Sequence, residues 1–121
     1  MYVSQIIESA LTGIVDGNIW PLSCPLEAPP NTFITYVVED SAREFADDDD
    51  QEWLHEVEIN WFSKPAQGRK PVNYVSARKA IRNALRSAGF SVTNVIPGYE
   101  NETGYTHLII MANALEDDIN G

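Results

Sequence analysis

A strict alternation of side chains between Trp53 and Phe62 constrains the fold more than any other stretch. One side of an extended chain carries apolar residues and a histidine: Trp53, His55, Val57, Ile59 and Trp61. The other side carries three polar residues between two apolar ones: Leu54, Glu56, Glu58, Asn60 and Phe62. Successive side chains of a β-strand point to opposite faces, so the pattern predicts a long strand with one buried face. Its sheet therefore needs a covering layer on one side.

The stretch from Pro71 to Gly89 predicts one helix of that layer. Apolar residues recur at steps of three and four, which places them on one stripe of an α-helix: Tyr74, Ala77, Ile81, Leu85 and Ala88. Asn73 is placed to cap the start of this helix, and Gly89 to close its end in a left-handed conformation. We expect the apolar stripe to be buried.

The remaining patterns predict an α+β fold, with a single antiparallel sheet of four to five strands packed against two helices. The further predicted elements are a helix at Ser4–Val15, a possible short strand at Ile19–Leu22, and strands at Phe33–Glu39, Phe90–Ile96 and Tyr105–Ala114. The strand 33–39 is expected to pair with 53–62 as a hairpin whose acidic tip spans about residues 40–52. An acidic tail is expected at 115–121.

Charge is distributed unevenly along a chain of 121 residues, a length that suits one domain over 1–121. The formal net charge is −10, and ten of the eighteen Asp and Glu lie between Glu39 and Glu58. Six of the eight Lys and Arg lie between Arg69 and Arg86. We therefore expect a molecule with an acidic end and a local basic surface.

Composition also excludes several classes of protein. The net negative charge repels the phosphates of nucleic acid, so general affinity for nucleic acid is not expected. No apolar run approaches the roughly 20 residues that a membrane helix needs, and the N-terminus lacks a signal-peptide pattern, so we expect no membrane contact and synthesis in the cytoplasm. Cys24 is the one cysteine, which excludes an internal disulfide.

Two groups of residues invite a metal interpretation. Asp47–Asp50 supplies four carboxylates, but without the alternate spacing and glycine of an EF-hand loop we interpret it as a solvated acidic segment. His55 and His107 both fall within predicted strands, where they could be neighbours that bind a metal or act as a base. We favour packed, hydrogen-bonded histidines, since no third ligand stands at a fixed spacing. We therefore predict no metal site and no cofactor.

Motifs of catalysis are missing from the sequence. It has no nucleophile elbow, no phosphate-binding glycine loop and no His-Glu-x-x-His. Ser63 and Ser76 have no base that the sequence identifies. We expect a protein without catalytic residues, not an enzyme.

The basic flank of the predicted helix, defined as Arg78, Lys79, Arg82 and Arg86, has three interpretations. It is a solvated face, a nucleic-acid contact, or a contact with an acidic surface of another copy. We favour the third, with Asp47, Asp48, Asp49 and Asp50 of the neighbour on the other side. Because the two patches differ, such a contact is heterologous, and repeated heterologous contacts close into rings or extend as filaments.

Four segments resemble the tail completion, or tail terminator, proteins of long-tailed phages and prophages. They are IWPLSCPLEAPPNTFITYVVED after the first helix, HEVEINWFSKP, YVSARKAIRNALRSAGF and YTHLIIMANAL. The resemblance covers about residues 6–115 and rests on the order of the elements and not on a catalytic motif. The Asp47–Asp50 insertion and the acidic tail depart from the family's pattern.

The resemblance implies a structural virion protein, made in the cytoplasm of the bacterial host and located in the virion tail. It implies a ring, typically hexameric, that caps the tail tube at its head-proximal end, ends tube polymerisation and offers a surface for the head. Its partners would be other copies, the tail tube protein and a head-neck connector protein, with DNA passing through without specific binding. The alternatives are an acidic DNA mimic that acts as a regulatory binding protein, or a related head-tail connector or neck protein.

Overall fold

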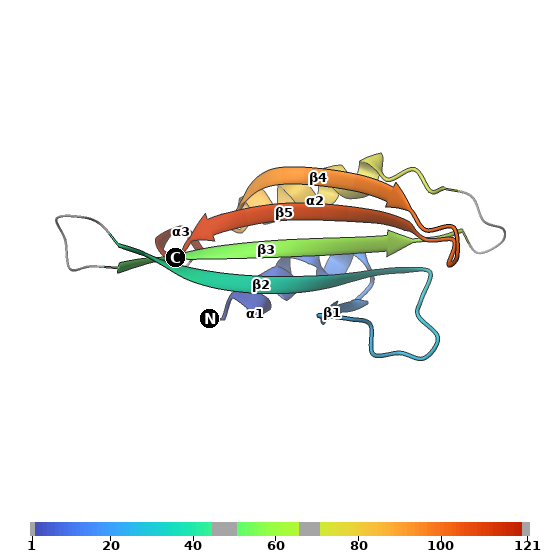
Figure 1. The fold of residues 1–121 in the computed structure, drawn as a ribbon, viewed down its shortest axis with the longest axis horizontal. Helices are drawn as coiled ribbons and strands as arrows, with labels where there is room; N and C mark the ends of the chain where they lie inside the picture. Colours follow the sequence, from blue (N-terminus) through green and yellow to red (C-terminus); the bar gives the residue numbers. More distant parts are fainter. Residues whose placement is uncertain (1, 45–50, 66–70, 120–121) are drawn as a thin grey trace.

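A computed structural model describes residues 2–44, 51–65 and 71–119, and it forms two layers (Figure 1). One layer is a sheet of five strands: β1 (Ile19–Pro21), β2 (Thr32–Glu44), β3 (Gln51–Ser63), β4 (Ser91–Tyr99) and β5 (Thr106–Leu115). The other layer holds α1 (Val3–Leu11), followed by the 3₁₀ turn η1 (Thr12–Ile14), and α2 (Val75–Ser87). A short third helix, α3 (Glu116–Ile119), follows β5. The predicted α+β class is confirmed.

The strands lie in the order β1-β2-β3-β5-β4. The β2–β3, β3–β5 and β4–β5 pairs are antiparallel, as predicted. The expectation of a wholly antiparallel sheet was wrong at β1, which pairs with β2 in parallel. The connector 22–31 returns the chain to the starting end of β1, so β2 runs in the same direction, as a parallel pair requires. The sheet is therefore mixed.

The predicted alternation along β3 places its odd-numbered residues under the helices. Val57 and Ile59 are fully buried there, in one core with Ile7 and Leu11 of α1 and with α2. Trp53 departs from the prediction, because 41% of its surface is exposed. The β3–β5 pairing ends at Leu54 with Leu115, so Trp53 lies beyond β5.

The hairpin strands are longer than predicted. The β2–β3 ladder continues to the pair formed by Glu44 and Gln51, so residues 40–44 belong to a strand and not to the acidic tip. Backbone hydrogen bonding does not depend on side-chain polarity, which explains why acidic residues lie within the ladder. At the other end of the chain, part of the expected acidic tail forms α3.

The prediction for α2 is confirmed in its buried stripe and in its end. Ile81 and Leu85 are fully buried. Gly89 has a φ of +99°, Phe90 N donates to the Leu85 carbonyl at 2.9 Å, and Gly89 N donates to the Arg86 carbonyl at 3.1 Å. These two bonds form the Schellman motif that ends many helices. The helix begins at Val75, one residue later than an Asn73 cap implies, although Asn73 Oδ1 accepts a hydrogen bond from Val75 N at 3.0 Å.

A polar contact also joins α1 to the sheet. The Tyr36 hydroxyl on β2 donates a hydrogen bond to a carboxylate oxygen of Glu8 on α1. Tyr36 is buried, and burial together with the Glu8 carboxylate raises the pKa of its hydroxyl well above the ordinary value. The hydroxyl therefore stays protonated and keeps its donor role at neutral pH.

Candidate interaction surfaces

The face of the sheet opposite the helices, here called the open face, carries three carboxylates in adjacent rows. Glu39 on β2 lies directly opposite Glu56 on β3, and Glu58 lies one row further along, between Val37 and Met111. Glu39 and Glu56 are exposed, and Glu58 is half-buried. We call these three residues the acidic cluster.

The acidic cluster is not neutralised within the part of the chain that the structure describes. No Lys or Arg there forms an ion pair with any of its three members, and Glu58 accepts one hydrogen bond, from Asn60 Nδ2 at 3.2 Å. Like charges directly opposite each other in a ladder destabilise a sheet. A shallow depression of about 170 Å³ lies over the cluster, between Val37 and Met111. The cluster is a negative surface that local stability does not explain.

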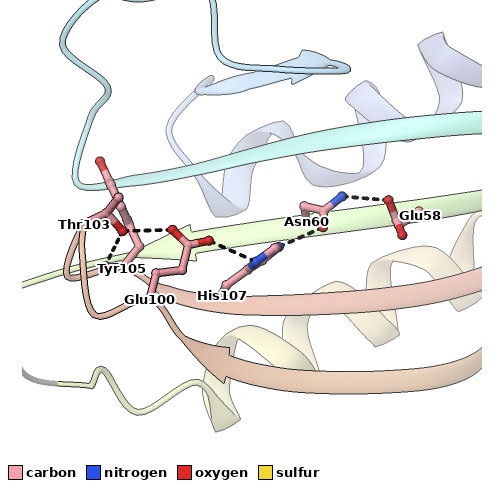
Figure 2. A network of polar contacts seen from close by, with 6 residues as sticks. All are labelled: Glu58, Asn60, Glu100, Thr103, Tyr105 and His107. Carbon is pink, nitrogen blue, oxygen red and sulfur yellow. Dashed lines mark hydrogen bonds and ion pairs between the residues drawn. The ribbon is translucent and has the colours of Figure 1, made fainter.

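The other end of the open face is aromatic and hydrogen-bonded (Figure 2). His107 stacks on Phe62 with ring centroids 4.2 Å apart, and its Nε2 lies 2.8 Å from Asn60 Oδ1. The Nδ1 atom lies 3.3 Å from a carboxylate oxygen of Glu100, the residue that follows β4. Tyr105 donates its hydroxyl to the Pro30 carbonyl at 2.8 Å. The favoured interpretation of His107 as a packed, hydrogen-bonded residue is confirmed.

His55 lies on the covered face, so the alternative that it neighbours His107 was wrong. Side chains at odd positions of β3 point toward the helices, whereas His107 pairs with Phe62 at an even position. Among residues 2–44, 51–65 and 71–119, no group of three or more His, Cys, Asp or Glu is arranged to hold a metal ion. The expectation for Asp47–Asp50 cannot be compared, since these residues lie outside the described ranges.

His55 has partners of its own, which the sequence did not reveal. Its Nδ1 lies 2.6 Å from Asp40 Oδ1 on the neighbouring strand β2, and its Nε2 lies 3.5 Å from Glu116 Oε1 on α3. Only 5% of the residue is exposed, and Nε2 has no hydrogen-bond partner among the described residues. Next to it is a cavity of about 330 Å³ that Tyr2, Ser4 and Val38 help to line.

The basic flank lies on α2, in the layer that covers the opposite face of the sheet (Figure 1). Lys79, Arg82 and Arg86 are exposed, while Arg78 is half-buried with its guanidinium carbon 6.0 Å from the Tyr74 ring centre. None of the four forms an ion pair within the described ranges. Arg82 and Arg86 line a cavity of about 460 Å³ that continues along residues 89–92. The flank thus presents available positive charge on the side of the molecule away from the acidic cluster.

No helix in the described ranges is both long enough and apolar enough to cross a membrane.

Comparison with known proteins identifies a solved structure with a similar fold. No family model and no curated protein matches the chain. A chain from the structure titled "Virion of native gene transfer agent (GTA) particle" superposes on it with a TM-score of 0.63. The match covers 93% of this chain and 92% of that chain, at 10% sequence identity. At this identity the comparison shows a shared fold over nearly the whole length of both chains.

Proposed function

We propose that the chain is a structural protein of a phage-like virion, and specifically a tail terminator without enzymatic activity. The observation that carries the proposal is the likeness over nearly the full length of a chain from a gene transfer agent virion. The ordered sequence segments that resemble tail terminators point in the same direction. In this role the protein caps the head-proximal end of the tail tube as a ring, ends tube polymerisation and contacts a head-neck connector.

Ring assembly in this proposal uses the basic flank. The four cationic side chains meet acidic residues of the β2–β3 hairpin of the next copy, with Asp47, Asp48, Asp49 and Asp50 as the main partners. Support comes from the four cationic side chains of the flank, none of which forms an ion pair within the described ranges. A contact between two unlike patches of one chain is heterologous, and a closed ring repeats such a contact. The family resemblance implies a hexamer.

The open face then provides the surface that faces DNA. The acidic cluster repels phosphate, so DNA passes through the bore without binding to it. Two observations support this assignment: none of Glu39, Glu56 and Glu58 forms an ion pair with a cation among the described residues, and Glu39 lies directly opposite Glu56, which destabilises a sheet.

Electron microscopy of tails made with and without the protein tests the proposed role. The proposal predicts overlong tubes, without a cap, when the protein is missing, and normal tube length when the gene is restored. Tubes of normal length in its absence would reject the terminator role. Binding of the purified protein to isolated tail tubes separates a terminator from a head-tail connector or neck protein, which shares the ring but does not bind the tube end.

The electrostatic interface has its own test. Arg82→Glu reverses one charge of the flank and is expected to shift the protein toward smaller species in sedimentation velocity, and raised salt is expected to do the same. Lys64→Glu makes the same charge change on a residue outside α2 and serves as the control. Sedimentation that is unchanged by Arg82→Glu in assembled material would reject the interface.

The acidic cluster, which no Lys or Arg of the described residues pairs with, also favours a second candidate, an acidic DNA mimic that captures a DNA-binding enzyme. A mimic presents carboxylates in place of phosphates and acts as a monomer or dimer. Size-exclusion chromatography with light scattering, followed by competition with DNA for a bound enzyme, distinguishes this candidate. A closed ring argues for the virion role.

A further inference from the structure

A buried histidine lies between two carboxylates that come from different elements. Asp40 is directly opposite His55 in the β2–β3 ladder, and its Oδ1 lies 2.6 Å from His55 Nδ1. Glu116, the first residue of α3, places its Oε1 3.5 Å from His55 Nε2. The imidazole therefore connects the stem of the hairpin to the helix that follows β5.

The protonation state of His55 decides whether this connection is favourable. A neutral imidazole has one N–H group, and the 2.6 Å contact with Asp40 assigns that hydrogen to Nδ1. The lone pair of Nε2 then faces the Glu116 carboxylate, which leaves a buried acceptor beside another acceptor. An imidazolium has N–H groups at both positions and can donate to both carboxylates. One added proton thus turns an unsatisfied contact into a charge-assisted hydrogen bond.

The attachment of α3 depends on few contacts. A helix of four residues has no stability of its own, so it needs tertiary contacts. Ile119 packs against the core, and the backbone carbonyl of Asp118 lies so close to Gly89 that a Cβ atom there would overlap with it. Glu116 at the start of α3 makes the contact with His55. The helix α3 lies near the end of the sheet where β2 and β3 form their hairpin (Figure 1).

We propose that His55 is a proton-operated latch that holds α3 against the sheet. Protonation of His55 strengthens the attachment of α3 through the contact with Glu116. Loss of the proton weakens this contact, while Asp40 still holds the imidazole in position. The charged and titratable groups that face His55 in the described structure are Asp40 from β2, Glu116 from α3 and Tyr2 before α1. No Lys or Arg is among the described residues that line this cavity.

The direction in which pH changes the attachment of α3 follows from the protonation state of His55 that can donate a hydrogen bond to Glu116. An imidazolium donates to both carboxylates, so the attachment of α3 is strongest at low pH, when His55 carries its second proton, and it weakens as pH rises and this proton is lost. This inference does not depend on the virion role, because it rests on contacts within one chain.

Amide hydrogen exchange by NMR, corrected for the intrinsic rate at each pH, measures the latch directly. Protection of the Ile119 amide, whose helical acceptor is the carbonyl four residues earlier, is expected to fall about tenfold from low to high pH, the size of one charge-assisted hydrogen bond. Glu116→Gln removes the charge from a side chain that is 44% exposed, so folding is expected to be retained. In this variant the pH dependence of protection should largely disappear.

His55→Gln provides the second variant, and His107→Gln is the matched control. His107 has carboxylate and amide partners too, but it lies on the open face and does not contact α3. The latch predicts that His107→Gln keeps the pH dependence and that His55→Gln loses it. Protection of α3 that does not change with pH, or that keeps its pH dependence in Glu116→Gln, would overturn the inference. If His55→Gln does not fold, Glu116→Gln alone decides the question.

Discussion

The two faces of one strand, β3, are governed by different requirements. Its odd-numbered residues, such as Val57 and Ile59, are fully buried beneath α1 and α2. Its even-numbered residues Glu56 and Glu58 lie on the open face. Neither is paired with a cation in the described ranges. Burial accounts for the first set, since each apolar side chain removed from water stabilises the fold. It does not account for the second set, which belongs to the proposed DNA-facing surface.

The largest expected difference in the free energy of unfolding is between substitutions at two adjacent residues of β3. Ile59→Ala leaves a cavity in the core and is expected to lower the free energy of unfolding by about 2–5 kcal/mol. Glu58→Ala, on the open face, is expected to change it by no more than about 0.5 kcal/mol. Chemical denaturation of both variants measures the contrast. Equal losses would show that the open face is part of a stabilising core.

Tyr36 tests the polar contact beneath the helices. Tyr36→Phe removes the hydrogen bond to Glu8 and leaves that carboxylate without its partner, at an expected cost of about 1.5–3 kcal/mol. Thr35→Val on the same strand serves as a comparison on the other face. A loss confined to Tyr36→Phe in denaturation experiments would support a specific link between α1 and the sheet.

The same tyrosine predicts a loss of stability in alkali. Its folded-state pKa is raised, so its contribution is complete below the unfolded value of about 10 and is lost as pH rises toward the folded value. Burial raises the pKa of Tyr105 in the same direction. Denaturation curves above about pH 10 should therefore show falling stability, with a shallower fall in Tyr36→Phe. An equal slope in both proteins would contradict the assignment.

A substitution at Gly89 tests the left-handed residue that ends α2 and its close packing against α3. Gly89→Ala places a side chain at a φ of +99°, against the backbone of α3, and is expected to destabilise the protein by about 1–2 kcal/mol. Gly13→Ala is the matched control, because no atom lies within contact distance of a Cβ at that position. Thermal unfolding of the two variants gives the comparison. A neutral Gly89→Ala would mean that α3 is readily displaced.

The smallest expected effect is an increase in the free energy of unfolding. Glu56→Gln removes the repulsion from Glu39 directly opposite and is expected to stabilise the sheet by about 0.2–1 kcal/mol. Glu102→Gln, in the exposed turn after β4, makes the same chemical change without an opposing carboxylate in the ladder and should have no effect. A stability gain together with DNA binding to the assembled ring would support the assignment of the acidic cluster to the DNA-facing surface.

The features that could be predicted from the sequence are those with a local period. The alternation along β3, the apolar stripe of α2 and the closing glycine Gly89 follow from residues a few positions apart. The parallel pairing of β1 and the exposure of Trp53 depend on where neighbouring strands begin and end, which the local pattern does not contain. The sequence therefore indicated which side of β3 is buried but not how far the buried area extends.

The contacts of His55 could not be predicted from the local sequence pattern either. Asp40 faces His55 only because of the hairpin register, and a shift of one residue would move Asp40 to the other face. Glu116 reaches His55 from α3, in a part of the chain that composition alone suggested to be a tail. The basic flank could be predicted, since helical spacing gathers its four residues, but its counterpart on Asp47–Asp50 lies outside the described ranges.

Electron cryomicroscopy of the assembled particle, with the chain placed in its density, tests the separation of the two charged surfaces most directly. The account predicts that Arg78, Lys79, Arg82 and Arg86 are buried against a neighbouring copy and that Glu39, Glu56 and Glu58 face the bore. A bore lined mainly by these basic residues, or a basic flank surrounded by solvent, would contradict it.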